Sequence, residues 1–316
     1  MKRELLMVLG GTARMRDRLS AAFNIHELDK IGDHGAFLCE MGAKIEAVVS
    51  GGHLGVEQPV LDRLPNLKIL SCFGVGYDAV DAVSLAKQGV MVTHTPDVLN
   101  DDVANTAIML LLATTRNVVF NDAYIRAGHW KSMGNPPLTR SMQNAKIGIL
   151  GLGRIGLATA ERLNIFNAQV VYHSRSKKDV SYQYYSDLVT MARDVDALIC
   201  TTPGGAENRH LVDRAVIDAL GPRGYLINVS RGSVVDERAL IAALQEARIA
   251  GAGLDVFEDE PNVPEALCAL ENVVLQPHIG SATHETRQAM GDLTCDNVLK
   301  FFETGAPLTP VQECIR

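Results

Sequence analysis

The feature that most limits how this chain can fold is a glycine motif, GLGRIG over residues 151–156. The short, mostly apolar run Lys146–Leu150 precedes it, and a helical pattern follows directly. In such a motif Gly151 permits a tight turn, Gly153 lets backbone N–H groups approach a phosphate, and Gly156 lets the helix pack on the strand. Because a helix N-terminus attracts negative charge, this context predicts a dinucleotide-binding βαβ unit.

Short apolar runs alternate with helical patterns along the whole chain, which indicates parallel sheets built from βαβ units. Helices are predicted at Asp101–Arg116 and Thr283–Thr304, and the second would return the chain to its first domain. We predict an α/β fold of two doubly wound parallel-sheet domains, with a Rossmann domain at 99–281 inserted in a flavodoxin-like domain at 1–98 and 282–316. The expected strands are Leu5–Leu9, Ile45–Val49, Ile69–Cys72 and Val90–Thr93 in the first sheet, and Lys146–Leu150, Gln169–Tyr172, Ala197–Thr201, Tyr225–Val229, Gly253–Val256 and Val273–Gln276 in the second.

The end of the second Rossmann strand bears on the choice of dinucleotide. An NAD-binding domain usually has Asp or Glu there, which accepts hydrogen bonds from ribose hydroxyls and would repel a 2′-phosphate. Here the segment reads HSRSKK over residues 173–178 and contains no acid. Arg175 can clamp a phosphate through two parallel hydrogen bonds. Ser174, Ser176 and Lys177 can add donors, so the loop favours NADPH over NADH, with a merely solvated basic loop as the alternative.

Polar residues follow three later strands, at the carboxyl ends where open α/β sheets bind their ligands. Arg231 follows the strand at 225–229 and could meet a carboxylate. Glu260 lies in an acidic turn after the next strand, and His278 follows the last one. Taken singly, each residue has a structural alternative: a salt bridge, a solvated loop and a core histidine.

Together these segments resemble the D-isomer-specific 2-hydroxyacid dehydrogenase family over nearly the whole chain. Within that family, the loop at 174–178 looks like that of the glyoxylate/hydroxypyruvate reductases, including the plant-type hydroxyphenylpyruvate reductases. Many members carry an acid where this chain has Asn105. The resemblance is carried by GVGYD at 74–78, VANTA at 103–107, RAGHW at 126–130, the glycine motif, Thr202-Pro203 and the three strand ends.

This resemblance implies NADPH-dependent reduction of a small 2-keto acid to the D-2-hydroxy acid. Arg231 would bind the carboxylate and the ketone oxygen, and His278 would protonate that oxygen as hydride arrives. Glu260 would orient the imidazole, and backbone N–H groups of Val75 and Gly76 in the substrate domain would hold the other carboxylate oxygen. The implied cofactor contacts are Gly151, Gly153, Arg154, Ile155, Gly156, Ser174, Arg175, Ser176, Lys177, Thr202, Pro203, Val229, Ser230, Asp255 and Gly280.

The predicted helix Asp101–Arg116 resembles the segment through which the family forms two-fold dimers. Its Ala104–Ala113 stretch is apolar nearly all round. Because a soluble monomer would not leave such a stripe exposed, we expect a homodimer.

Composition excludes several other classes of partner. A net charge of −7 argues against a nucleic-acid surface, and the apolar run Ala107–Ala113 is far shorter than the roughly 20 residues of a membrane span. The six cysteines form no C-x-x-C pair, which fits reduced thiols in the cytoplasm. We expect no metal, because His278 and His284 are joined by no other ligands at suitable spacing.

Alternative functions remain on the same fold. One is a related dehydrogenase acting on hydroxyphenylpyruvate, phosphoglycerate, phosphite or formate, although formate enzymes of this family replace the glutamate found here at 260. The alternative from another class is a dinucleotide-sensing, corepressor-like binding protein. The basic loop and the lack of long disordered tails favour a reductase.

Overall fold

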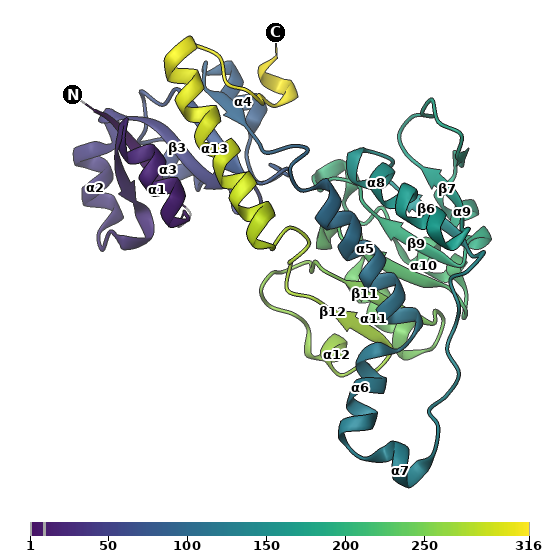
Figure 1. Ribbon diagram of the computed structural model, residues 1–316. Helices are drawn as coiled ribbons and strands as arrows, with labels where there is room; N and C mark the ends of the chain where they lie inside the picture. Colours follow the sequence, from purple (N-terminus) through teal and green to yellow (C-terminus); the bar gives the residue numbers. More distant parts are fainter. Residues whose placement is uncertain (1, 9–10, 316) are drawn as a thin grey trace. The chain divides into compact units, whose positions relative to one another are not determined.

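The chain forms two compact units, each built on one parallel sheet. The computed structural model describes residues 2–8 and 11–315 (Figure 1). Unit 1 contains the residues up to Leu99 and those from Thr283 onward, and unit 2 is Asn100–Ala282.

The sheet of unit 1 has the strand order β2-β1-β3-β4-β5, with all neighbouring strands parallel. This is the flavodoxin-like order. The sequence predicted four of these strands and missed β2, and the predicted end of the first strand at Leu9 lies outside the described residues. The strands are β1 (Arg3–Met7), β2 (Phe23–Glu27), β3 (Ile45–Gly51), β4 (Ile69–Phe73) and β5 (Met91–Thr93).

Helices cover both faces of this sheet. One face packs against α1 (Ala13–Ser20) and the long α13 (His284–Thr304), through a core that includes Leu19 and Val298. The other face packs against α2 (His34–Met41), α3 (Gln58–Leu61) and α4 (Ala82–Lys87). The sheet is therefore doubly wound, as predicted.

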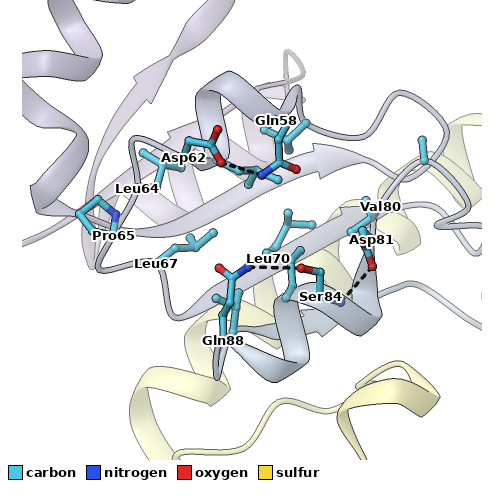
Figure 2. Close-up of a pocket in the computed structure, with 15 residues that line it drawn as sticks. Gln58, Asp62, Leu64, Pro65, Leu67, Leu70, Val80, Asp81, Ser84 and Gln88 are labelled. Carbon is cyan, nitrogen blue, oxygen red and sulfur yellow. Dashed lines mark hydrogen bonds between the residues drawn. The ribbon is translucent and has the colours of Figure 1, made fainter.

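The described part of unit 1 also contains a cavity of about 660 Å³ on the α3 and α4 side. In Figure 2, Gln58 and Asp62 lie on one side of it, Ser84 and Gln88 on the other, and Leu70 between them. None of the residues predicted to bind cofactor or substrate lines this cavity.

The sheet of unit 2 has seven parallel strands in the order β12-β11-β10-β9-β6-β7-β8. Beginning from β8, this is the Rossmann order with one strand added at the far edge. The predicted fold class is confirmed. The short edge strand β8 is the one strand of this sheet that the sequence did not predict. The strands are β6 (Lys146–Leu150), β7 (Gln169–His173), β8 (Gln183–Tyr184), β9 (Ala197–Cys200), β10 (Tyr225–Asn228), β11 (Gly251–Leu254) and β12 (Val273–Leu275).

Helices also cover both faces of the second sheet. On one face, α5 (Asn100–Thr115) packs against β10, β11 and α8 (Arg154–Leu163). The opposite face is covered by α9 (Leu188–Asp194), α10 (Arg214–Leu220) and α11 (Glu237–Gln245).

Helix α5 carries the apolar stripe from which we predicted a subunit interface. Val103, Ala107, Leu110 and Leu111 are buried inside unit 2. The unit's own sheet thus covers most of the stripe.

The helices beyond α5 are more exposed. Figure 1 shows α6 (Val118–Arg126) and α7 (His129–Met133) projecting from the rest of unit 2, and neither contains a buried residue. Among the described residues no single helix is long and apolar enough to cross a membrane, and α5 and α6 meet that criterion only as a pair bent by 57°.

Side-chain caps explain where many of these helices begin. Aspartates at 33, 81, 187, 213 and 236 each accept a hydrogen bond from a backbone N–H in the first turn of the following helix. Thr12 and Thr283 do the same for α1 and α13. Such caps satisfy donors that a helix N-terminus otherwise leaves unpaired.

Candidate active site

The glycine motif connects β6 to α8, and its geometry fits a dinucleotide. Gly151 has φ +92°, and a Cβ there would lie 2.8 Å from the backbone of Thr202. A Cβ on Gly156 would lie 2.2 Å from the carbonyl oxygen of Gly151. Protein packing thus requires glycine at both positions.

Gly153 differs, because a Cβ there would meet no atom within 4 Å. Gly153 is also the N-cap of α8 and, as a glycine, has no side chain that could cap the helix. The protein therefore leaves open space at the N-terminus of this helix, where backbone N–H groups can hold a pyrophosphate. The predicted residues Arg154 and Ile155 are the first two of α8.

The basic loop after β7 adjoins the glycine motif, since the Gly151 N–H donates to the carbonyl of His173 over 2.9 Å. Ser174 Oγ donates to the Ser176 carbonyl at 2.7 Å, which folds the loop back on itself. Arg175 extends into solvent and forms an ion pair with Glu207, with Nη1 and Oε1 3.0 Å apart. The sequence analysis missed Glu207, which lies 32 positions further along the chain.

The three predicted catalytic residues follow three neighbouring strands. Arg231 comes after β10, Glu260 lies in the loop after β11, and His278 follows β12. The His278 Nδ1 lies 2.7 Å from Glu260 Oε2. The other carboxylate oxygen of Glu260 accepts the backbone N–H of Phe257 at 3.1 Å. Glu260 is thus fixed to its own loop while it orients the imidazole.

A buried carboxylate holds the backbone around His278. Asp255 is 2% exposed, and its two carboxylate oxygens accept the N–H groups of Ile279 at 2.7 Å and Gly280 at 2.8 Å. The His278 N–H donates to the Asp255 carbonyl, also at 2.8 Å. Burial raises the pKa of the Asp255 carboxyl above its ordinary value, although these backbone N–H groups act to lower it.

The backbone of His278 itself is unusual. Its φ of +54° lies in the left-handed region, which residues other than glycine adopt uncommonly. Such conformations persist where surrounding contacts enforce them, and they cluster at functional sites. The contacts of Asp255 with the loop supply that enforcement. This geometry favours a positioning role for Asp255, which the sequence analysis had grouped with the cofactor contacts.

A second buried polar side chain shapes the turn that carries Arg231. Asn228 is 1% exposed, and its Oδ1 accepts the N–H of Ser230 at 3.0 Å and the Ser230 hydroxyl at 2.6 Å. Its Nδ2 donates to the Arg231 carbonyl at 3.0 Å. Arg231 in turn donates from Nη1 to the Ser230 carbonyl at 2.7 Å. Asn228 is not among the residues predicted from the sequence, because it belongs to none of the recognised motifs.

Other predicted residues lie in three places, each after a strand. Val229 and Ser230 are buried in the turn after β10, and Thr202 and Pro203 follow β9 beside the glycine motif. Val75 and Gly76 belong to unit 1, where they follow β4. Among the described residues no group of three or more His, Cys, Asp or Glu side chains could hold a metal ion.

Known proteins are similar in sequence to most of this chain. Residues 108–280 match the family described as D-isomer specific 2-hydroxyacid dehydrogenase, NAD binding domain. The chain is 49% identical to hydroxyphenylpyruvate reductase of Plectranthus scutellarioides over 87% of this chain and 88% of the relative. It is 44% identical to glyoxylate/hydroxypyruvate reductase A of Arabidopsis thaliana over 97% of this chain and 98% of the relative.

A solved structure shares the whole fold. The NADPH-dependent glyoxylate/hydroxypyruvate reductase of Sinorhizobium meliloti, in complex with NADP and malonate, superposes with a TM-score of 0.92 at 43% identity. The match covers 99% of this chain and 98% of that one. The resemblance found in the motifs is confirmed, and unit 2 contains the family's domain for a nicotinamide dinucleotide. The chain belongs to the family of D-isomer-specific 2-hydroxyacid dehydrogenases.

Proposed function

We propose that this enzyme reduces a small 2-keto acid of the glyoxylate or hydroxypyruvate type to the D-2-hydroxy acid, with NADPH as reductant. The observation that carries the proposal is the 2.7 Å pair of His278 and Glu260 on strand ends next to that of Arg231. Relatives named as glyoxylate/hydroxypyruvate reductases support this substrate class.

The chemistry of reduction fits the three side chains. A bound nicotinamide supplies hydride to the keto carbon, so the ketone oxygen must gain a proton. Arg231 binds the substrate carboxylate and stabilises the negative charge that develops on the ketone oxygen. Glu260 engages Nδ1 of His278, which leaves Nε2 as the atom that delivers the proton. That Val75 and Gly76 bind the other carboxylate oxygen stays a prediction.

The preference for NADPH is part of the proposal. No carboxylate ends β7, and Arg175 with Ser174, Ser176 and Lys177 offers donors that suit a 2′-phosphate. The solved relative from Sinorhizobium meliloti is described as NADPH-dependent and in complex with NADP, which supports the same choice here.

One screen tests the proposed activity. Oxidation of NADPH and of NADH is followed with glyoxylate, hydroxypyruvate, pyruvate and 4-hydroxyphenylpyruvate, and kcat/KM is compared for each combination. We expect the highest values with NADPH and with glyoxylate or hydroxypyruvate. Equal efficiency with both cofactors would refute the NADPH preference, and no turnover of any keto acid would refute the reductase.

Reduction of hydroxyphenylpyruvate is the second candidate, because the relative from Plectranthus scutellarioides is 49% identical. The same screen separates the two. A kcat/KM for 4-hydroxyphenylpyruvate above that for hydroxypyruvate would favour the aromatic substrate.

We further propose that two copies of the chain form a homodimer through α6 and α7. These helices contain no buried residue and expose Val118, Val119, Ile125, Trp130 and Met133. Such a group of apolar side chains on projecting helices is typical of a subunit interface. Light scattering on wild type and on Val119→Glu tests it, with a dimer expected only for the former. Location in the cytoplasm stays a prediction.

A further inference from the structure

Arg175, the residue proposed to hold the 2′-phosphate, already has an acidic partner. Its Nη1 lies 3.0 Å from Oε1 of Glu207, and the two side chains are 82% and 65% exposed. Both are therefore in solvent and able to exchange partners.

The backbone that carries Glu207 is fixed. Glu207 lies in the short 3₁₀ helix Ala206–Asn208. The buried Asn208 donates from Nδ2 to the carbonyl of Pro203 at 3.1 Å. Arg209, the next residue, forms an ion pair of 2.5 Å with Glu258. The carboxylate of Glu207 is thus held within reach of the basic loop by its neighbours.

A guanidinium binds a carboxylate and a phosphate through the same planar N–H donors. Arg175 cannot give the same N–H groups fully to Glu207 and to a 2′-phosphate. A dinucleotide that carries the phosphate competes with Glu207 for the Nη1 donors of Arg175, and one without the phosphate leaves the pair intact.

We propose that Glu207 is a specificity-determining residue that occupies Arg175 in place of the 2′-phosphate and so weakens the preference for NADPH. This inference rests on the proposed role of Arg175 in cofactor binding. Because exposed ion pairs are weak, the expected effect on a binding constant is about two- to fivefold. The direction of the change in binding constant separates this role from the opposite one, in which Glu207 holds Arg175 ready for the phosphate.

Direct binding to the full-length protein provides the test. Calorimetry measures the Kd of adenosine 2′,5′-bisphosphate and of adenosine 5′-monophosphate for wild type and Glu207→Gln. We expect the variant to bind the bisphosphate about two- to fivefold more tightly and the monophosphate unchanged. Glu246→Gln is the control, since Glu246 is an exposed carboxylate paired with Arg248 in the same unit. Unchanged or weaker bisphosphate binding in Glu207→Gln would overturn the inference.

Arg175→Ala and the double variant Arg175→Ala/Glu207→Gln show whether the effect passes through the arginine. We expect Arg175→Ala to weaken bisphosphate binding and the second substitution to add nothing. A gain that persists without Arg175 would mean that Glu207 repels the phosphate directly, against the proposal. If Arg175→Ala has no effect, the assigned cofactor loop itself is wrong. If Arg175→Ala weakens binding but Glu207→Gln does not strengthen it, only the role of Glu207 fails.

Discussion

Replacement of Asp255 by Asn should slow catalysis strongly while it leaves the protein folded. In the wild type, the two carboxylate oxygens accept the backbone N–H groups of Ile279 and Gly280. An amide has one oxygen and one NH₂ group, so one backbone donor would face another donor. The loop would then have to move. His278 belongs to this loop, directly before Ile279, and its own N–H donates to the Asp255 carbonyl.

The expected change in stability is the balance of two opposed effects. An unpaired buried donor costs about 1–3 kcal/mol. Against this cost, burial raises the pKa of Asp255, which means that the folded protein disfavours the ionised carboxylate present at neutral pH. The neutral amide removes that penalty. We expect the free energy of unfolding to change by only about 1 kcal/mol at neutral pH, within the ordinary range for single substitutions.

The dependence on pH follows from the direction of the shift. A carboxyl whose pKa is raised by folding contributes stability below its unfolded pKa, and that contribution is lost as pH rises through the folded pKa. Relative to Asp255→Asn, the wild type should therefore become more stable as the pH falls into the acid range where carboxyl groups titrate.

Catalysis should suffer more than stability. A displacement of about 1 Å at a reacting group can cost roughly 100-fold in rate, so we expect kcat to fall by about 10- to 100-fold. The measurements are kcat with a saturating keto acid, the Kd of NADPH by fluorescence, and Tm at neutral and acid pH. Asp213→Asn is the control, because asparagine caps a helix about as well as aspartate and Asp213 caps α10. A kcat near that of the wild type would refute the positioning role of Asp255.

Three further substitutions test the site. His278→Gln should lower kcat by about 10²–10⁴ with the Kd of NADPH unchanged, and a nearly normal kcat in steady-state assays would exclude His278 as the proton donor. Arg231→Lys should impair both KM and kcat, because an ammonium cannot bridge carboxylate and ketone as a planar guanidinium does. A change in Tm alone would instead mark Arg231 as part of a structural ion pair. Gly232→Ala should lower both kcat and Tm, because the added Cβ would lie 1.9 Å from the backbone of Phe257. Such overpacking lowers the free energy of unfolding by about 1–3 kcal/mol. A wild-type Tm for that variant would contradict the close packing of these two loops.

The sequence predicted the central strands of both sheets and the edge strands β5 and β12, but it missed the edge strands β2 and β8. Buried parallel strands such as β6 and β9 are nearly continuous apolar runs, which stand out in any window. β2 is an edge strand in which polar residues alternate with apolar ones and only Phe23 is fully buried. β8 has two residues, Gln183 and Tyr184, and depends on pairing with β7 rather than on its own composition.

For the site, the sequence predicted residues that follow strands and belong to motifs. It could not show which residues hold them, because those contacts join segments that are distant along the chain. Glu207 pairs with Arg175, which lies 32 positions earlier in the sequence. Asp255 accepts a hydrogen bond from Ile279, which lies 24 positions later. Only the folded sheet brings such pairs together, since it aligns the carboxyl ends of strands that the sequence keeps apart.

The order of strands in unit 2 separates the loop proposed to select the cofactor from the residues proposed to carry out the chemistry. His278 follows β12 and the basic loop follows β7, with β11, β10, β9 and β6 between them. At about 4.8 Å per strand, five steps across the sheet amount to roughly 24 Å. Substitutions of side chains this far apart usually have additive effects on a measured free energy. We therefore expect substitutions in the pair formed by Glu207 and Arg175 to change which dinucleotide is preferred without moving His278, and substitution of Asp255 to change the rate without altering that preference.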